Sequence, residues 1–423
     1  MRLTVVGGGS TYTPELVDGF CRLRDQLPLA ELVLVDPDQH RLELVGGMAR
    51  RMFARAGHPA KVITTADLDA GVTGSDVVLL QLRVGGQSLR NRDETWPLDC
   101  GCIGQETTGA GGLAKALRTV PVVLDAAERI RRLAAPDAWI VDFTNPVGIV
   151  TRALLREGHR AVGLCNVAIG FERAFAELLS VRPDEVRLDH AGLNHLTWIR
   201  GVTVAGQDRL PQLLAEHGPE LAERVELPLG LLRDLGAIPS YYLRYFYLHD
   251  TVVAEQRASG TRAAEVAAIE AELLALYADP AVDTKPAALE RRGGAYYSEA
   301  AVALVASLLS DRQDVQVVNL LNRGTLPFLA DDAVIEVPAV IGVDGPRAVE
   351  VTPLEPRFAG LVAHVAAYED LALDAALRGG RSRVEKALLA HPLVGQIDLA
   401  EGLADRLIAE NAAYLPWTSA GAR

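Results

Sequence analysis

Cysteine is scarce in this chain, with four residues among 423. Cys21, Cys100, Cys102 and Cys165 do not have the spacing of a disulfide framework, and Cys100-x-Cys102 is not a zinc-type pair. We therefore expect free thiols in a reducing cytoplasm. The start of the chain also lacks the charged, apolar and cleavage segments of a secretory signal, which agrees with a cytoplasmic location.

Long apolar runs and excess positive charge are also missing. Hydrophobic residues make up 49% of the chain, yet the longest apolar run, near residues 300–309, reaches only about half of the roughly 20 residues that span a membrane. The net charge of −13 argues against nucleic acids and anionic membranes as partners, because clustered positive charge binds both. A small anionic substrate would need arginines of its own.

The order of predicted elements indicates two packed domains, since 423 residues exceed one small core. Strand-like segments alternate with helical patterns and lie at residues 3–7, 32–36, 62–64, 76–82, 138–144 and 161–165. This alternation predicts an α/β fold with a Rossmann-type, doubly wound parallel sheet whose ligands collect at the carboxyl ends of the strands. We expect this domain over residues 1–168.

After about residue 170 the pattern changes to longer helices mixed with short strands such as 334–340. The expected helices cover residues 266–277, 298–309, 361–377 and 399–413. This pattern predicts a second, α+β domain over residues 169–423. The cleft between two such domains is the expected place for an active site.

The first predicted strand runs directly into three glycines at positions 7–9. Gly7 and Gly9 allow a sharp turn and a close approach to a phosphate, and the first amides of the next helix supply donors. The second strand ends in Asp36, an acid suited to an adenosine ribose. We expect a dinucleotide to contact Gly7, Gly9, Ser10, Thr11 and Asp36. Because Tyr12 replaces the third glycine of the usual motif, the alternative is a plain strand-to-helix turn with Asp36 as a helix cap.

Two possible metal ligands follow predicted strands. Cys165 ends the strand at 161–165, and His195 follows it by thirty residues in Gly192-Leu193-Asn194-His195. A thiolate and an imidazole would make an open metal site that keeps positions for substrate oxygens and water, which suits the polarisation of a carbonyl. The alternative is a buried strand-end thiol and an interface histidine with local hydrogen bonds.

Four tyrosines occur within residues 241–247. A phenol has an ordinary pKa near 10 and is a poor base at neutral pH, unless a nearby metal or arginine lowers that pKa. The same pattern also fits an aromatic helix face at a domain interface. Arginines whose forked guanidinium suits an anion occur at Arg83, Arg90, Arg92, Arg291 and Arg292.

Taken together, these segments resemble glycoside hydrolase family 4 over nearly the whole chain. The matching stretches are Val5 to Pro14, Gly104-Gln105-Glu106-Thr107-Thr108-Gly109, Thr144-Asn145-Pro146, Cys165-Asn166, Gly192 to His195, Tyr242-Leu243-Arg244-Tyr245 and Arg292-Gly293-Gly294. The resemblance implies a hydrolase that depends on NAD and a divalent metal, usually Mn²⁺, and acts on 6-phosphoglycosides. It implies oxidation at C3, removal of the C2 proton, elimination of the aglycone, addition of water and return of the hydride to C3.

The resemblance also implies roles for single residues. It assigns the metal to Cys165 and His195, and the C2 base to Tyr242, with the adjacent Tyr241 as the alternative. The remaining assignments are Arg90 and Asn145 at sugar hydroxyls, Asn145 also at the cofactor, Asn166 beside metal and sugar, and Arg292 at the 6-phosphate. Relatives that cut α-glycosides tend to carry Asp after the metal cysteine, so Asn166 favours a 6-phospho-β-glucosidase.

Three alternatives stay open. One is a family 4 glycosidase for α-, galacto- or unphosphorylated glycosides. Another is an NAD-linked dehydrogenase of the lactate or malate type, which would accumulate NADH and need no metal. A third is a non-catalytic NAD-binding regulator, which would need neither a base nor a Lewis acid. The resemblance further implies a homodimer or homotetramer.

Overall fold

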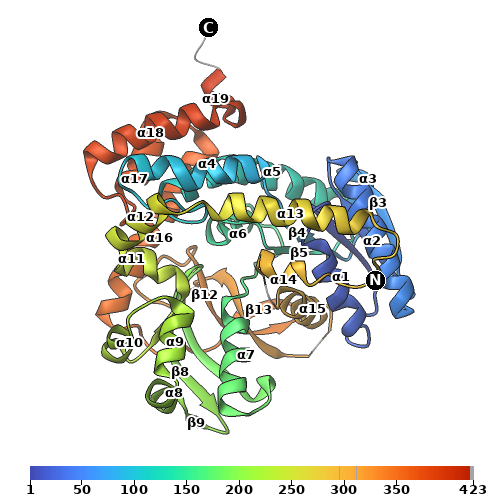
Figure 1. The fold of residues 1–423 in the computed structure, drawn as a ribbon, viewed down its shortest axis with the longest axis horizontal. Coiled ribbons are helices and arrows are strands. Elements are labelled where there is room, and N and C mark those ends of the chain that lie inside the picture. Colours follow the sequence, from blue (N-terminus) through green and yellow to red (C-terminus); the bar gives the residue numbers. More distant parts are fainter. Residues whose placement is uncertain (295, 311, 420–423) are drawn as a thin grey trace.

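The computed structural model describes residues 1–294, 296–310 and 312–419, and a single mixed sheet runs through both halves of the chain (Figure 1). Its parallel strands are β1 (Arg2–Val6), β2 (Glu31–Val35), β3 (Lys61–Thr65), β4 (Val77–Leu80), β5 (Trp139–Asp142) and β6 (Ala161–Gly163). Their order across the sheet is β3-β2-β1-β4-β5-β6. This is the Rossmann order, in which the winding reverses between β1 and β4 and leaves a crevice for a ligand. The predicted strands and fold class are confirmed.

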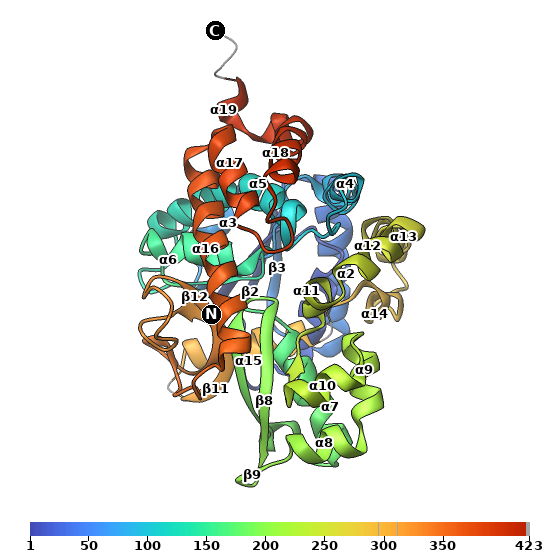
Figure 2. The same ribbon diagram turned by 90° about the vertical axis from the view of Figure 1, so that its left-hand side faces the viewer.

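Helices connect these strands and cover both faces of the parallel part. They are α1 (Thr13–Arg22), α2 (Gln39–Ala56), α3 (Leu68–Val72), α4 (Gly86–Asp99), α5 (Gly109–Leu133), α6 (Val147–Arg156) and α7 (Val167–Leu179). The short apolar strands β4 and β5 are buried along their whole length, as expected for parallel strands between two layers of helices. In Figure 2, α5 and α6 lie against α16 (Pro356–Arg378), the long helix of the C-terminal half.

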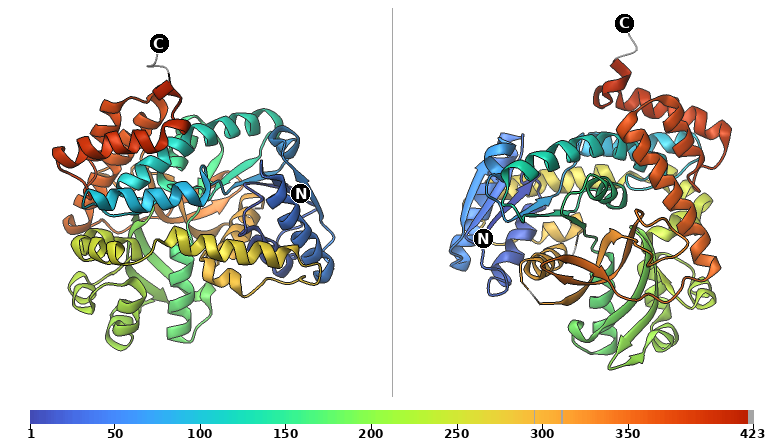
Figure 3. Two further views of the ribbon diagram at one scale, coloured as in Figure 1. Left: turned by 45° about the horizontal axis from the view of Figure 1, so that its top comes forward. Right: turned by 180° about the vertical axis from the view of Figure 1, so that it is seen from behind.

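The second half of the chain extends the same sheet with antiparallel strands (Figure 3). They are β7 (Arg187–Leu193), β8 (Leu196–Val204), β9 (Gln207–Asp208), β10 (Ile238–Pro239), β11 (Asp314–Leu321), β12 (Val334–Gly342) and β13 (Gly345–Ala348). The expected strand at 334–340 lies within β12 and is confirmed. Since β11 pairs with β6, the sheet is continuous across residue 168, and the division of the chain into 1–168 and 169–423 stays a prediction.

The remaining helices surround the antiparallel strands or return to the first half. They are α8 (Leu210–Glu216), α9 (Gly218–Val225), α10 (Leu229–Leu235), α11 (Arg244–Tyr247), α12 (His249–Ala258), α13 (Arg262–Ala278), α14 (Ala288–Arg292), α15 (Tyr297–Leu308), α17 (Arg381–Leu389), α18 (Ile397–Asn411) and α19 (Pro416–Ser419), with short 3₁₀ turns at Pro183–Glu185, Tyr241–Leu243 and Ala412–Tyr414. The four expected helices correspond to α13, α15, α16 and α18 and are confirmed. Within the described parts of the chain, no helix is long and apolar enough to cross a membrane.

Helix α13 connects the C-terminal half of the chain to the glycine-rich loop after β1 through direct contacts. It packs against α2 and α4 (Figure 1), and the hydroxyl of its buried Tyr277 donates a hydrogen bond of 2.7 Å to the carbonyl of Thr11. This bond gives a buried loop carbonyl its donor, which a closely packed interior requires.

We expect Tyr277→Phe to lower the free energy of unfolding by about 1–2 kcal/mol, because the Thr11 carbonyl loses its donor while buried. Urea denaturation measures this loss. Tyr414→Phe is the control, since Tyr414 is 42% exposed and such changes stay within about 0.5 kcal/mol. Equal stability of the two variants would show that the Tyr277 hydroxyl contributes nothing.

Candidate active site

A cleft of about 1160 Å³ opens at the carboxyl ends of the parallel strands. Its wall includes residues that directly follow four strands: Gly7 after β1, Asp36 after β2, Gln81 after β4 and Phe143 after β5. The predicted site residues that line it are Gly7, Ser10, Asp36, Arg90, Asn145, Asn166, His195, Tyr241, Tyr242 and Arg292. Three others, Gly9, Thr11 and Cys165, lie beside lining residues without forming the wall. The fold therefore collects the predicted residues around one space.

Gly7 and Gly9 shape the part of the cleft that follows β1. Gly7 has a φ of +89°, and a Cβ there would lie 2.6 Å from the carbonyl oxygen of Gln81. A Cβ on Gly9 would lie 2.9 Å from a carboxylate oxygen of Asp36. A side chain at Gly7 would meet backbone in a left-handed conformation, and one at Gly9 would displace the Asp36 carboxylate, so the loop packs tightly against the ends of β2 and β4.

Asp36 anchors this loop and does not cap a helix. Its carboxylate accepts a hydrogen bond of 3.0 Å from the amide of Gly9, and it lines the cleft. The cap of α2 is Asp38, whose side chain accepts from the amide of Arg41. The helix-cap alternative for Asp36 is therefore wrong. Burial raises the pKa of the Asp36 carboxyl above its ordinary value.

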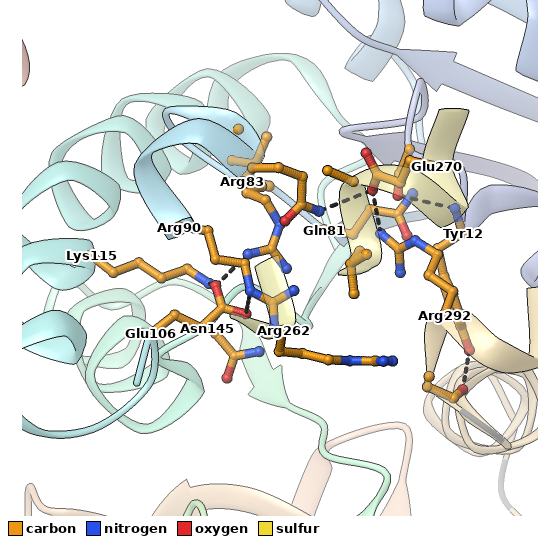
Figure 4. Close-up of a pocket in the computed structure, with 18 of the residues that line it drawn as sticks. Tyr12, Gln81, Arg83, Arg90, Glu106, Lys115, Asn145, Arg262, Glu270 and Arg292 are labelled. Atoms are coloured by element: carbon orange, nitrogen blue, oxygen red, sulfur yellow. Dashed lines mark hydrogen bonds and ion pairs between the residues drawn. The ribbon is translucent and has the colours of Figure 1, made fainter. Parts of the chain in front are cut away.

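Glu270 on α13 gathers several polar groups beside the loop (Figure 4). It pairs with Arg292 at 3.2 Å and Arg41 at 3.3 Å, and accepts from the Gln87 side chain at 3.1 Å. Arg292 also donates to the hydroxyl of Thr11 at 2.9 Å. Burial acts to raise the pKa of Glu270, but Arg292 and Arg41 outweigh it and hold the pKa below its ordinary value. Arg292 thus lies between the loop and the cleft.

A second carboxylate, Glu106, gathers cationic side chains from around α4 and α5 at another part of the cleft (Figure 4). It forms ion pairs with Arg83, with Arg90 at 3.1 Å and with Lys115 at 2.5 Å. Burial opposes its charge, yet these three cations hold the pKa of Glu106 well below its ordinary value. Burial lowers the pKa of Lys115 to about 8. From the sequence, Glu106 was placed in a stretch that matches the family but was assigned no role. Its three cationic partners are seen only in the folded structure, so the sequence held no signal for this cluster.

Cys165 follows the parallel part of the sheet, and His195 lies in its antiparallel part. Cys165 is buried just after β6, and His195 occupies the turn between β7 and β8 with a φ of +62°. Burial lowers the pKa of His195 to about 4, so its imidazole is neutral at pH 7, as a metal ligand requires. Burial and the Glu336 carboxylate raise the pKa of the Cys165 thiol. A bound cation would therefore be needed to favour the thiolate.

No group of three or more His, Cys, Asp or Glu side chains that suits a metal occurs within residues 1–294, 296–310 and 312–419. A metal held by two side chains alone keeps open coordination positions, which is typical of catalytic sites and not of structural ones.

Tyr242 lies directly against His195. The two rings stack with centroids 3.6 Å apart and an angle of 8°. Burial, and after it the nearby Cys165 thiol, raise the pKa of Tyr242 well above its ordinary value, while Arg90 lies close enough for favourable charge interaction with this tyrosine. Tyr241 is placed differently, since its hydroxyl oxygen accepts a hydrogen bond of 3.0 Å from Arg244.

Comparison with known proteins covers nearly the whole chain. A protein described as a probable 6-phospho-beta-glucosidase of Bacillus subtilis is 40% identical over 98% of this chain and 97% of its own length. A 6-phospho-beta-glucosidase of Escherichia coli is 36% identical over 98% and 96%. The solved 6-phospho-beta glucosidase of Thermotoga maritima with NAD and glucose-6-phosphate has a TM-score of 0.91, 33% identity, and coverage of 98% of this chain and 99% of that one.

The same Thermotoga maritima enzyme was also solved with manganese, NAD⁺ and glucose-6-phosphate, with a TM-score of 0.91, 32% identity and the same coverage. Malate dehydrogenase of Salinibacter ruber shares the fold alone, with a TM-score of 0.54 and 19% identity over 89% of this chain and 98% of that one. Residues 2–181 match the family 4 glycosyl hydrolases, and residues 190–394 match their C-terminal domain. The chain therefore belongs to glycoside hydrolase family 4.

Proposed function

We propose that this protein is an NAD- and divalent-metal-dependent 6-phospho-β-glucosidase that oxidises C3 and eliminates the aglycone across C1 and C2. The observation that carries the proposal is the stack of Tyr242 on His195, beside Cys165, in a cleft at the carboxyl ends of a Rossmann sheet. A base next to two metal ligands suits the removal of a proton from a carbon atom that is bonded to a ketone carbon. The similar enzymes of Escherichia coli and Thermotoga maritima support the substrate class.

The residues present fit NAD. The tight turn at Gly7 lies at the crevice between β1 and β4, where a pyrophosphate binds in this fold. Asp36 at the end of β2 is placed for the ribose hydroxyls. Asn145 lines the cleft and carries a buried side-chain oxygen without a hydrogen-bond partner in the described structure. That oxygen suits a hydroxyl donor of the cofactor or the sugar.

The residues present also fit a divalent metal at Cys165 and His195. Thiolate and imidazole together favour a transition metal over Mg²⁺ or Ca²⁺. We propose Mn²⁺, because the similar Thermotoga maritima enzyme was solved with manganese. When bound, NAD supplies reversible hydride acceptance and the metal supplies Lewis acidity. These two properties make the C2 proton acidic enough for a side chain to remove.

We assign that proton to the phenolic oxygen of Tyr242, whose pKa a bound cation together with Arg90 would have to lower for the phenolate to form. As the C2–H bond breaks, its electron pair forms the C1–C2 double bond and the aglycone leaves C1 with its electrons. Arg90 stabilises the phenolate and contacts the sugar, and Glu106 holds Arg90 and Lys115 in place. We further propose that Asn166 faces metal and sugar and that Arg292 contacts the 6-phosphate, for which Glu270 and Thr11 position its guanidinium.

Hydrolysis of p-nitrophenyl 6-phospho-β-glucoside with NAD⁺ and Mn²⁺ under reducing conditions tests the proposal. We expect nitrophenol release that needs both additions and leaves no net NADH. The α-anomer, the galacto epimer and the unphosphorylated glucoside should react more slowly, and faster turnover of any of them would identify it as the substrate class. Release of no aglycone, with NADH accumulating on a hydroxy acid, would favour a dehydrogenase.

Asp36→Ala should weaken NAD binding about 10-fold or more, because a hydrogen bond to a charged group contributes about 1.5–3 kcal/mol. Quenching of protein fluorescence by NAD measures the affinity. Asp67→Ala is the matched control after the neighbouring strand β3, since it removes the cap of α3 and Asp67 is not part of the cleft wall. That variant should lose about 1 kcal/mol of stability and keep its NAD affinity. Equal affinities of both variants would remove Asp36 from the cofactor site.

We also propose a cytoplasmic homodimer or homotetramer, and an N-terminal cofactor domain over residues 1–168 with a catalytic and oligomerisation domain over 169–423. The resemblance to the family supports the assembly. Light scattering after size exclusion gives the mass in solution, and a mass of one 45.3 kDa chain would contradict it.

A further inference from the structure

The parallel and antiparallel parts of the sheet meet along a row of four residues. Strand β6 pairs with β11 through Gly163 and Asn319, β11 with β12 through Asn319 and Glu336, and β12 with β7 through Glu336 and Gly192. Cys165 follows the first glycine by two residues, and His195 follows the second by three. Both ends of this row, which we call the seam, therefore lead into the proposed metal ligands.

The two glycines allow the strands of the seam to approach closely. A Cβ on Gly163 would lie 2.9 Å from the Cβ of Asn319, and one on Gly192 would lie 2.0 Å from the carbonyl oxygen of Leu196. A larger residue at Gly163 would collide with Thr151 on α6 and Asn319 on β11, and one at Gly192 would collide with the backbone of β8. The seam therefore keeps Asn319 and Glu336 in a narrow interior space.

The carboxylate of Glu336 is held firmly in this space. Its side chain is buried, with 1% exposed, and accepts three hydrogen bonds: from His190 at 3.0 Å, Asn194 at 2.9 Å and Asn319 at 3.1 Å. These donors come from β7, from the β7–β8 turn and from β11. A buried carboxylate without such donors would be strongly destabilising, so this arrangement depends on several elements at once.

Asn194 connects this carboxylate to both proposed ligands. Its amide donates to Glu336, and the same side chain lies beside the sulfur of Cys165. Asn194 also immediately precedes His195, whose left-handed backbone must be fixed for its ring to face the cleft. Holding one amide side chain thus fixes the thiol and the histidine turn together.

We propose that Glu336 is the positioning residue of the metal site, which through Asn194 sets Cys165 and His195 in the arrangement that binds a divalent cation. Glu336 itself is neither a ligand nor a contact of the substrate. The inference rests on the proposed function, because that function places the metal at Cys165 and His195. Partners behind metal ligands commonly change metal affinity about 10- to 100-fold when they are replaced.

The test compares Mn²⁺ binding of the full-length protein and its Glu336→Gln variant, with free Mn²⁺ counted by electron paramagnetic resonance. Glutamine has the shape of glutamate, but its NH₂ group would face the donor groups that now bind the carboxylate. We therefore expect the Mn²⁺ affinity to fall about 10- to 100-fold. The thiolate-to-metal absorption of the Co²⁺-loaded protein should weaken as well, a change that a purely structural role does not cause. NAD affinity should be unchanged.

Two further variants make the result decisive. Glu15→Gln is the matched control, because Glu15 is also buried, on α1, and pairs with Ser298 and Lys285 away from the seam; its Mn²⁺ affinity should equal that of the wild type. Asn194→Ala breaks the connection at a half-buried position and should lower Mn²⁺ affinity even if Glu336→Gln does not fold.

Wild-type Mn²⁺ affinity and an unchanged Co²⁺ spectrum in Asn194→Ala or in folded Glu336→Gln would overturn the inference and leave the proposed function intact. A wild-type protein that takes up neither cation would contradict the metal site of the proposed function, and the inference would fall with it.

Discussion

Tyr242→Phe is expected to lower kcat for a 6-phospho-β-glucoside by about 10²–10⁴-fold, the range that a positioned general base contributes. The ring itself should stay in place, since its stack on His195 does not use the hydroxyl. NAD and Mn²⁺ affinities should therefore persist, and the loss should fall on kcat. Steady-state kinetics with saturating cofactor and metal measure this effect.

Tyr241→Phe is the matched control for this variant. Tyr241 is the neighbouring residue, lines the same cleft and has its ring centroid 5.7 Å from that of Tyr242. Its hydroxyl is engaged by Arg244, so its loss should reduce kcat far less. A larger loss in Tyr241→Phe than in Tyr242→Phe would transfer the role of the base to Tyr241.

Cys165→Ser should lower kcat/KM about 10³-fold at a Mn²⁺ concentration that saturates the wild type, because a catalytic metal contributes several kcal/mol. A serine hydroxyl is a harder and far less acidic ligand than a thiol, so it binds the metal weakly. Raising the Mn²⁺ concentration should restore part of the activity. Activity measured over a metal titration gives both values.

Cys102→Ser is the control for this second variant, since Cys102 is also buried, with 2% exposed, and its sulfur lies 3.9 Å from the carbonyl oxygen of Cys100. It should keep the metal dependence of the wild type. Unchanged activity of Cys165→Ser across the whole titration would refute the metal assignment.

The sequence predicted the residues at strand ends well, because a strand that runs into glycine or a polar residue is a local signal. Gly7 and Asp36 directly follow parallel strands, Asn166 comes three residues after β6, and the cleft forms where those strands end. The fold class followed from the same alternation of strands and helices. Local pattern was therefore sufficient for one wall of the site.

The buried carboxylates needed the structure. Glu270 on α13 meets Arg41 on α2 only after distant helices pack, and Glu106 meets Arg83 and Arg90 only after its loop folds back on α4. An isolated glutamate in a sequence looks like a surface residue. The continuity of the sheet was missed for the same reason, because a single pair, Gly163 with Asn319, joins its two parts. Such pairings depend on tertiary packing and leave no periodic pattern.

Turnover of p-nitrophenyl 6-phospho-β-glucoside in deuterated water, with NAD⁺ and Mn²⁺, tests the central claim most directly. Oxidation at C3 followed by proton removal at C2 predicts one solvent deuterium at C2 of the released sugar phosphate and no net NADH. Direct displacement at C1 would leave the C2 hydrogen in place. Product that carries no deuterium at C2 would therefore contradict the account.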